Sequence, residues 1–180
     1  MISIKLYAGF NVKELELLGS GTQGKVYRID SQKCIKIFKK SQVCKDELET
    51  LSMAQIDSHF PRLYGYGEKY IIRECINGIE LNKYLSSHPL TPDISNKIIK
   101  LYEAMVRVGY TRLDTALFHI FITPSNELKL IDTSKAIKKR TTYPNLILSG
   151  LDKLGYKKDF IDFVKATNPE VYNKWLHLSK

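Results

Sequence analysis

Two short stretches of the sequence carry residue types suited to chemistry on phosphates. Gly19, Gly21 and Gly24 fit the pattern G-x-G-x-x-G, and glycines in such a turn let backbone amides approach phosphate oxygens. Lys36 follows 12 residues after Gly24, within the apolar run KCIKIF. A lysine held in a strand can place one fixed positive charge beside a phosphate. The two stretches together indicate a nucleotide site.

Two aspartates flank a later apolar segment. In RLDTALFHIFITPSNELKLID, Asp114 precedes the segment and Asp132 ends it, 18 residues further on. The runs 118–122 and 128–131 are joined by a turn-forming stretch, so we predict a hairpin with one carboxylate at each end. Such a pair suits a catalytic base and a magnesium ligand that face the same phosphates. Taken singly, an aspartate at such a position is more often a cap or turn residue.

The residues after the glycines decide which kind of nucleotide loop is expected. A dinucleotide-binding loop requires a helix that begins at the last glycine. Here Lys25 and Val26 open an alternating, strand-like run. We therefore predict a strand–turn–strand hairpin that covers the phosphates.

The elements around these residues predict an α+β chain. Strands are expected over 15–18, 25–29, 33–38, 62–66 and 69–73, with a helix over 43–56. Thr91 and Pro92 form a helix start, and Gly109 a helix stop. Further helices are expected over 146–154, 158–165 and 169–178. The front is strand-rich, the back is helix-rich, and a hinge lies near residues 75–78.

Composition narrows the class of protein. The 180 residues include 28 basic and 19 acidic ones, a net charge of +9, which favours phosphate-bearing partners. The three cysteines have no disulfide or zinc spacing, which indicates buried free thiols in a reducing cytoplasm. The first ten residues lack the apolar core of a secretory signal, and no apolar run could span a bilayer. We expect a soluble cytoplasmic protein with no membrane partner.

In this order the motifs resemble the protein kinase-like superfamily, over about residues 15–135. The closest resemblance is to small, atypical serine/threonine kinase-like proteins of Gram-positive bacteria, with RIO-type and Kdo kinases as more distant relatives. The resemblance implies one minimal two-lobed domain over 1–180. Its β-rich N-lobe, with one helix, would cover about 1–76, and a reduced helical C-lobe would cover 77–180.

The resemblance also implies ATP, with Mg²⁺ or Mn²⁺, and a set of roles. Lys36 would orient the phosphates, held by Glu47 or, failing that, Glu49. Asp114 would be the catalytic base, and Asp132 with His119 would carry the metal ion. Main-chain groups at Glu74, Cys75 and Ile76 would hydrogen-bond adenine. The predicted nucleotide-binding residues are Leu18, Gly19, Ser20, Gly21, Thr22, Gln23, Gly24, Lys25, Val26, Lys36, Glu47, Glu74, Cys75 and Ile76.

Several positions depart from the family pattern. These are Arg112-Leu113 for H-R before the catalytic aspartate, Ala116 for a lysine, His119 for an asparagine and Thr133-Ser134 for F-G. An A-P-E motif is absent. The first interpretation is an ATP-dependent kinase that transfers the γ-phosphate to a serine or threonine of a protein, or to a small molecule with a hydroxyl. The second is a pseudokinase that binds a nucleotide or a partner without transfer. A basic nucleic-acid-binding protein ranks last, because no aromatic residues cluster on a basic face.

Overall fold

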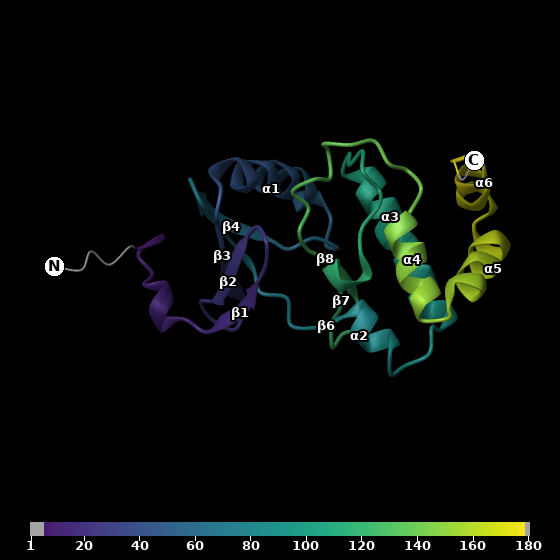
Figure 1. The fold of residues 1–180 in the computed structure, drawn as a ribbon, viewed down its shortest axis with the longest axis horizontal. Coiled ribbons are helices and arrows are strands. Elements are labelled where there is room, and N and C mark those ends of the chain that lie inside the picture. Colours follow the sequence, from purple (N-terminus) through teal and green to yellow (C-terminus); the bar gives the residue numbers. More distant parts are fainter. Residues whose placement is uncertain (1–5, 179–180) are drawn as a thin grey trace.

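The computed structural model describes residues 6–178 and is drawn in Figure 1. Residues 1–5, within the segment expected to lack a secretory signal, and residues 179–180 lie outside the described residues. The chain is α+β: a five-stranded antiparallel sheet and helix α1 come first, and a small sheet with several helices follows. Figure 1 shows the large sheet towards one end of the molecule and α5 and α6 at the other.

The large sheet has the strand order β1-β2-β3-β5-β4. Short alternating runs of branched and aromatic residues predict all of its strands, and the structure confirms them. A short 3₁₀ turn, Val12–Glu14, precedes the sheet. The bounds are β1 Leu17–Ser20, β2 Gly24–Arg28, β3 Lys33–Phe38, β4 Leu63–Gly67 and β5 Tyr70–Glu74.

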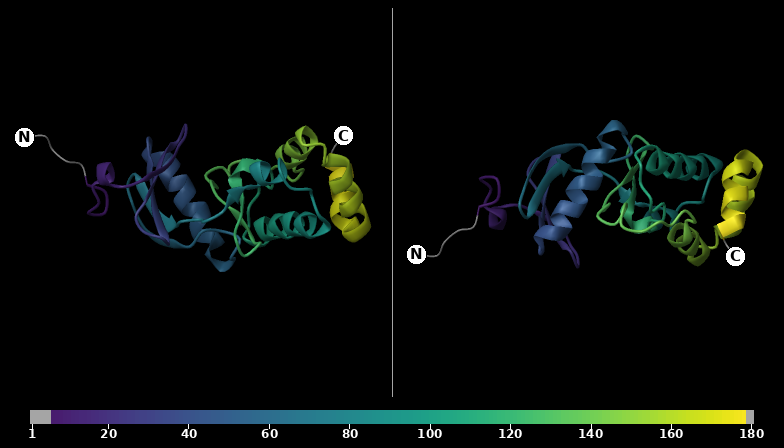
Figure 2. Two further views of the ribbon diagram at one scale, coloured as in Figure 1. Left: turned by 90° about the horizontal axis from the view of Figure 1, so that it is seen from below. Right: turned by 90° about the horizontal axis from the view of Figure 1, so that it is seen from above.

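Register places Lys36 in the middle of this sheet. It pairs with Val26 on β2 and Ile71 on β5, so the three side chains share one face. Helix α1 (Ser41–Met53) covers that face and buries Cys44 and Leu51. In both views of Figure 2, α1 lies between the strands and the second half of the chain.

The second half of the chain begins with a small sheet of order β6-β7-β8. Strands β7 and β8 form the predicted hairpin, whereas β6 and α2 were not expected. His119 was expected within a strand but lies in the 3₁₀ turn that precedes β7. The bounds are β6 Ile79–Glu80, α2 Leu81–Leu85, η3 Leu117–His119, β7 Ile120–Ile122 and β8 Leu128–Leu130. A further 3₁₀ turn, η2 (Ala54–Ile56), follows α1 in the first half of the chain.

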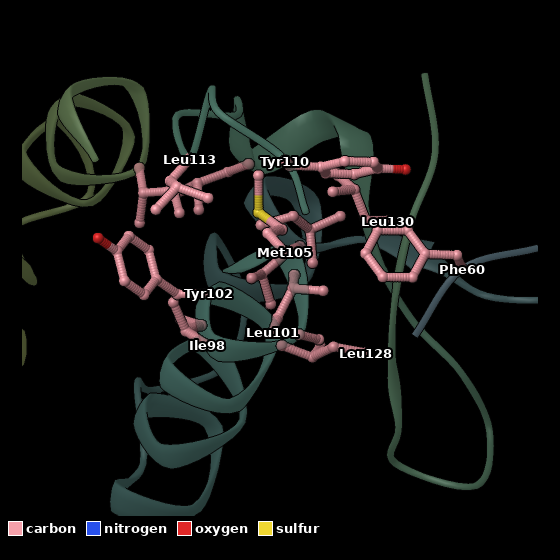
Figure 3. Packing of buried hydrophobic residues seen from close by; sticks show 14 of the residues in the cluster. Phe60, Ile98, Leu101, Tyr102, Met105, Tyr110, Leu113, Leu128 and Leu130 are labelled. Carbon is pink, nitrogen blue, oxygen red and sulfur yellow. The ribbon is translucent and has the colours of Figure 1, made fainter. Parts of the chain in front are cut away.

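Helix α3 (Pro92–Arg107) organises the core of the second half. Its start is the predicted one, because the Thr91 hydroxyl accepts a hydrogen bond from the Ile94 N–H at 3.3 Å. Gly109 follows its end with a φ of +84°, a conformation that suits glycine. Figure 3 shows α3 side chains packed against Leu128 and Leu130 of β8.

Three further helices follow, as predicted, and their bounds are α4 Asn145–Lys153, α5 Lys157–Thr167 and α6 Pro169–Leu178. One buried apolar cluster runs from Phe38 in β3 to Trp175 in α6. The three cysteines are buried and free, as predicted. Among residues 6–178 no helix is both long and apolar enough to cross a membrane.

An ion pair also ties η2 to α3. The Asp57 carboxylate accepts from the Arg107 guanidinium at 2.5 and 3.0 Å and from the His59 ring at 2.7 Å. Burial alone would raise the pKa of Asp57. The His59 backbone N–H, the guanidinium and the imidazole outweigh burial and lower this pKa to about 2.

Candidate active site

Lys36 is a buried cation with a dedicated partner. Its Nζ lies 2.5 Å from Oε2 of Glu47 on α1, and both side chains are less than one-tenth exposed. Glu49, the alternative partner, is exposed on the same helix. Burial raises the pKa of Glu47, while the charge on Lys36 opposes this rise. The pair fixes the lysine at one point on the inner face of the sheet.

Asp132 brings a second carboxylate to the same lysine. Its Oδ1 lies 3.8 Å from the Nζ of Lys36, although the two residues are far apart in sequence. Asp132 has a φ of +58°, a left-handed conformation that is uncommon for a residue other than glycine. Such backbone strain persists where the surroundings fix it, and it is enriched at functional sites. The strained backbone lies two residues after the end of β8, where the carboxylate faces Lys36.

A chain of hydrogen bonds holds the segment after Asp132 against α1. The Thr133 and Thr50 hydroxyls are 2.9 Å apart, and both residues are buried. The Tyr110 hydroxyl donates to the Thr50 carbonyl at 3.0 Å. Thr133 therefore links Asp132 to the helix that carries Glu47. The sequence gives no local signal for this link, because the partners are 83 residues apart.

Asp114 caps a helix at the opposite end of the hairpin. Its Oδ1 accepts from the Leu146 N–H at 2.6 Å, in the first turn of α4. Burial raises the pKa of Asp114, and the Leu146 N–H and Arg112 limit the rise. The capping bond fixes the carboxyl group, and an ionised carboxylate has further acceptor positions for a substrate proton. Asp114 is thus positioned by a bond that is also a structural cap.

A cavity of about 260 Å³ joins the two aspartates. Asp114, Asp132, His119 and Gln23 all contribute to its lining, so the expected convergence of both hairpin ends occurs. Apolar side chains form part of its wall, among them Met105, Tyr110 and Leu130. The cavity could admit a side chain or a small molecule beside the Asp114 carboxylate.

The glycine loop folds over Lys36 through Gln23. The Gln23 amide donates to the Ser134 hydroxyl at 3.1 Å, and its carbonyl oxygen lies 3.5 Å from the Nζ of Lys36. Gly24 is buried against β3, where an added Cβ would lie 2.0 Å from the Ile37 carbonyl oxygen. Leu18, Gly19, Ser20, Gly21, Thr22 and Lys25 are exposed, and Val26 is half-buried. Only Gln23 of this loop reaches the cavity described above.

His119 and Asp132 are the residues that could hold a metal ion. The Nε2 of His119 lies 3.8 Å from Oδ2 of Asp132. Burial lowers the pKa of His119, which favours the neutral, ligating imidazole. Over residues 6–178, no group of three or more His, Cys, Asp or Glu gathers to hold a metal. The Asp132 carboxylate suits Mg²⁺ or Mn²⁺ that is shared with substrate phosphates, because Mg²⁺ commonly takes only one or two carboxylates from the protein. The imidazole of His119 suits a softer metal ion better than Mg²⁺, which prefers oxygen ligands.

The expected adenine-binding segment lies at the end of β5. The Glu74 N–H donates to the Arg62 carbonyl at 2.8 Å, and the Cys75 N–H to the Gln32 carbonyl at 2.7 Å. These two amides are therefore used within the chain. The Glu74 carbonyl is also used, because it accepts from the Arg73 guanidinium at 3.1 Å and from the Cys34 thiol at 3.6 Å. Among the described residues, the Cys75 carbonyl and the backbone of Ile76 are the groups left for a base. Glu74 and Cys75 line a second cavity, of about 640 Å³, whose lining does not include Asp114 or Asp132.

The structure thus gathers Lys36, Glu47, Asp132, His119 and Gln23 in one place and joins them to Asp114 through a cavity. No known family model matches the chain, and no curated protein shows significant similarity to it. The chemistry of the site must therefore be inferred from its own residues.

Proposed function

We propose that the chain is an ATP-dependent phosphotransferase with a kinase-like, two-lobed fold. Its large sheet and α1 would form the N-lobe, and the small sheet and later helices a reduced C-lobe. One observation carries the proposal: Lys36, held by Glu47, lies 3.8 Å from Asp132, which shares a cavity with Asp114. A buried ion pair alone has many structural uses. A buried lysine between two carboxylates, beside a cavity with a third, suits the transfer of a charged group.

Each residue has a distinct part in this proposal. Lys36 binds the α- and β-phosphates, and the loop with Gln23 covers them. Asp132, with His119, holds Mg²⁺ or Mn²⁺ together with the phosphates, and the metal ion supplies charge neutralisation at the transferred group. The Cys75 carbonyl and the backbone of Ile76 offer main-chain groups to the base. Positioning and charge stabilisation supply most of the rate in this reaction class.

Asp114 accepts the proton of the acceptor hydroxyl. Its carboxylate is held by the Leu146 N–H and is half-buried at the cavity. Because burial raises the pKa of Asp114, its carboxylate is a stronger base than an exposed aspartate. The acceptor is a serine or threonine hydroxyl of a protein, and a hydroxyl of a small molecule fits the same chemistry.

A second candidate is a nucleotide-binding module without transfer activity. The observation in its favour is that residues departing from the kinase pattern, His119 and Thr133-Ser134, line the cavity. Ala116, at the cavity, also offers no charge to a transferred phosphoryl group. This candidate retains ATP binding and loses only the proton transfer at Asp114.

Transfer of label from γ-labelled ATP tests both candidates. The full chain is incubated with Mg²⁺ or Mn²⁺ and a generic protein acceptor, alongside Asp114→Asn and Lys36→Gln. Matched controls are Asp152→Asn and Lys174→Gln, which alter exposed residues of α4 and α6. Loss of a general base lowers rates by about 10²- to 10⁴-fold, so we expect transfer to fall by that amount in Asp114→Asn and to persist in both controls.

The outcomes separate the candidates. ATP binding without transfer by the wild-type chain supports the second candidate. A chain that binds no ATP, or transfers label equally well after either site substitution, contradicts the proposal. Salt-sensitive binding of random RNA that is indifferent to ATP would favour a nucleic-acid-binding protein.

A further inference from the structure

Two cations line the cavity of Asp114, and the proposed transfer assigns neither of them a contact with the nucleotide or the acceptor. Arg112 and Lys135 both line the cavity that contains Asp114. Among residues 6–178 neither side chain forms an ion pair. By contrast, Lys129 is paired with Glu74 at 2.9 Å, and Lys138 is paired with Asp46. The two cations at the cavity are therefore available to an anionic group from outside the chain.

Backbone hydrogen bonds fix the place of these two cations. The Thr111 and Arg112 N–H groups donate to the Ala136 carbonyl at 3.0 and 2.8 Å. The Thr141 N–H donates to the Thr111 carbonyl at 3.0 Å, and Arg112 and Thr141 form a parallel bridge. The segment that carries Lys135 is thus bound to the segment that leads to Asp114. The backbone of both residues is therefore held at the cavity, and the charge of Arg112 acts on the Asp114 carboxylate.

Apolar side chains complete the rim of this cavity. Phe118 is 52% exposed and Leu146 is 41% exposed, and both belong to the lining. Exposed apolar side chains next to available cations suit a partner that offers both acidic and apolar groups. The two carboxylates of the cavity already have partners, because Asp114 accepts the Leu146 N–H and Asp132 lies 3.8 Å from the Nζ of Lys36. The rim therefore favours negative charge on the acceptor.

We propose that the acceptor is a polypeptide segment with acidic residues next to its serine or threonine. This inference rests on the proposed phosphotransfer and names the acceptor class for the same site. Acidic side chains pair with Arg112 and Lys135, and an apolar residue of the segment packs on Phe118 and Leu146. The hydroxyl then lies at Asp114. A segment with basic residues would place like charges together, which weakens its binding.

Binding of peptides without transfer tests the acceptor class independently of activity. One fluorescent peptide carries a serine flanked by glutamates and followed by leucine, and its partner has lysines in place of the glutamates. We expect the glutamate peptide to bind the full chain about tenfold or more tightly, with affinity falling as salt rises. Arg112→Gln and Lys135→Gln should each weaken it about three- to tenfold.

Two further variants distinguish binding at the cavity rim from attraction to the overall positive charge of the chain. Lys174→Gln removes an exposed positive charge from α6 and should change glutamate-peptide affinity by less than about twofold. Phe118→Ser should weaken binding of the leucine peptide more than that of a version with asparagine instead. Equal affinity for both charge forms, or unchanged affinity in Arg112→Gln and Lys135→Gln, overturns the inference. Tighter binding of single-stranded RNA than of the glutamate peptide also overturns it.

Transfer to the same peptides distinguishes this inference from the proposed function. If γ-phosphate reaches a serine of either peptide, the phosphotransferase proposal is supported, and the ratio of the two kcat/KM values tests the acceptor class. Selective binding of the glutamate peptide with no transfer and no ATP binding would support the docking surface and contradict the phosphotransferase. Transfer that favours the lysine peptide would support the enzyme and contradict the acceptor class.

Discussion

Removal of Glu47 offers a quantitative test of the buried pair. In Glu47→Ala, Lys36 keeps its burial but loses its partner at 2.5 Å. With an effective dielectric constant of about 20, that contact carries about 7 kcal/mol of gross attraction. Most of this is offset because the variant no longer buries a carboxylate. Breaking a buried pair costs about 3–5 kcal/mol net. Asp132, 3.8 Å away, still compensates Lys36 in part, so we expect a loss near the lower limit, about 3 kcal/mol.

The assay is urea unfolding of the full chain, followed by circular dichroism, with ATP binding measured in parallel. The control is Asp162→Ala, which breaks the exposed pair between Lys158 and Asp162 at 2.7 Å. Such surface pairs contribute about 0–1 kcal/mol. The double variant Lys36→Met with Glu47→Leu replaces both charges with apolar groups, so its stability should lie within about 1 kcal/mol of wild type.

ATP binding distinguishes this double variant from the wild type. It should lose ATP affinity although it remains folded, because it lacks the charge that we propose binds the phosphates. The reasoning is refuted if Glu47→Ala costs no more stability than the surface control. It is also refuted if the double variant binds ATP as tightly as the wild-type chain does.

Three other perturbations have defined outcomes. Gln23→Ala should tighten ATP binding about fivefold in a titration, because about 1 kcal/mol of contacts no longer competes with the phosphates; weaker binding would contradict this role. Gly24→Ala should lower the free energy of unfolding in urea by more than about 2 kcal/mol, because the added Cβ would lie 2.0 Å from the Ile37 carbonyl oxygen. The control Gly21→Ala adds its Cβ in open space and should leave this free energy unchanged. The pKa of Asp57 is lowered to about 2, so the ionised carboxylate stabilises the folded chain by about 2 kcal/mol above pH 4, and this stability is lost as the pH falls towards 2. An Asp57→Asn chain with the same acid unfolding profile as wild type would contradict this prediction.

Local patterns were sufficient to predict most of the elements. The strands of the large sheet, α3 with its Thr91 cap and the β7–β8 hairpin all follow from the period of apolar residues and from turn or cap residues. The strand order of the large sheet does not follow from such patterns, because β5 lies between β3 and β4. Strand β6 and helix α2 were not predicted, because each is too short to show a periodic pattern of apolar residues.

The residues of the candidate site were predicted where they lie close in sequence, and the contacts between distant segments were not. Lys36 and Glu47 are 11 residues apart on adjoining elements, and the kinase-like resemblance implied their pairing, with Glu49 as the alternative. The bond from Leu146 to Asp114 spans 32 residues, and the place of Arg112 and Lys135 depends on backbone pairing between distant segments. No sequence pattern indicates such contacts. His119 shows the limit of local reasoning, because its apolar neighbours suggest a strand where the chain makes a 3₁₀ turn.

The most direct measurement of the central claim uses an acyl-phosphate derivative of ATP, followed by peptide mass spectrometry. Such a reagent transfers its acyl group to a lysine amine that lies beside the bound phosphates, and ATP leaves. If the glycine loop, Lys36 and Asp132 surround one triphosphate, Lys36 becomes the dominant acylated residue, and excess ATP prevents its labelling. Labelling spread over the exposed lysines, and unaffected by ATP, would contradict the claim.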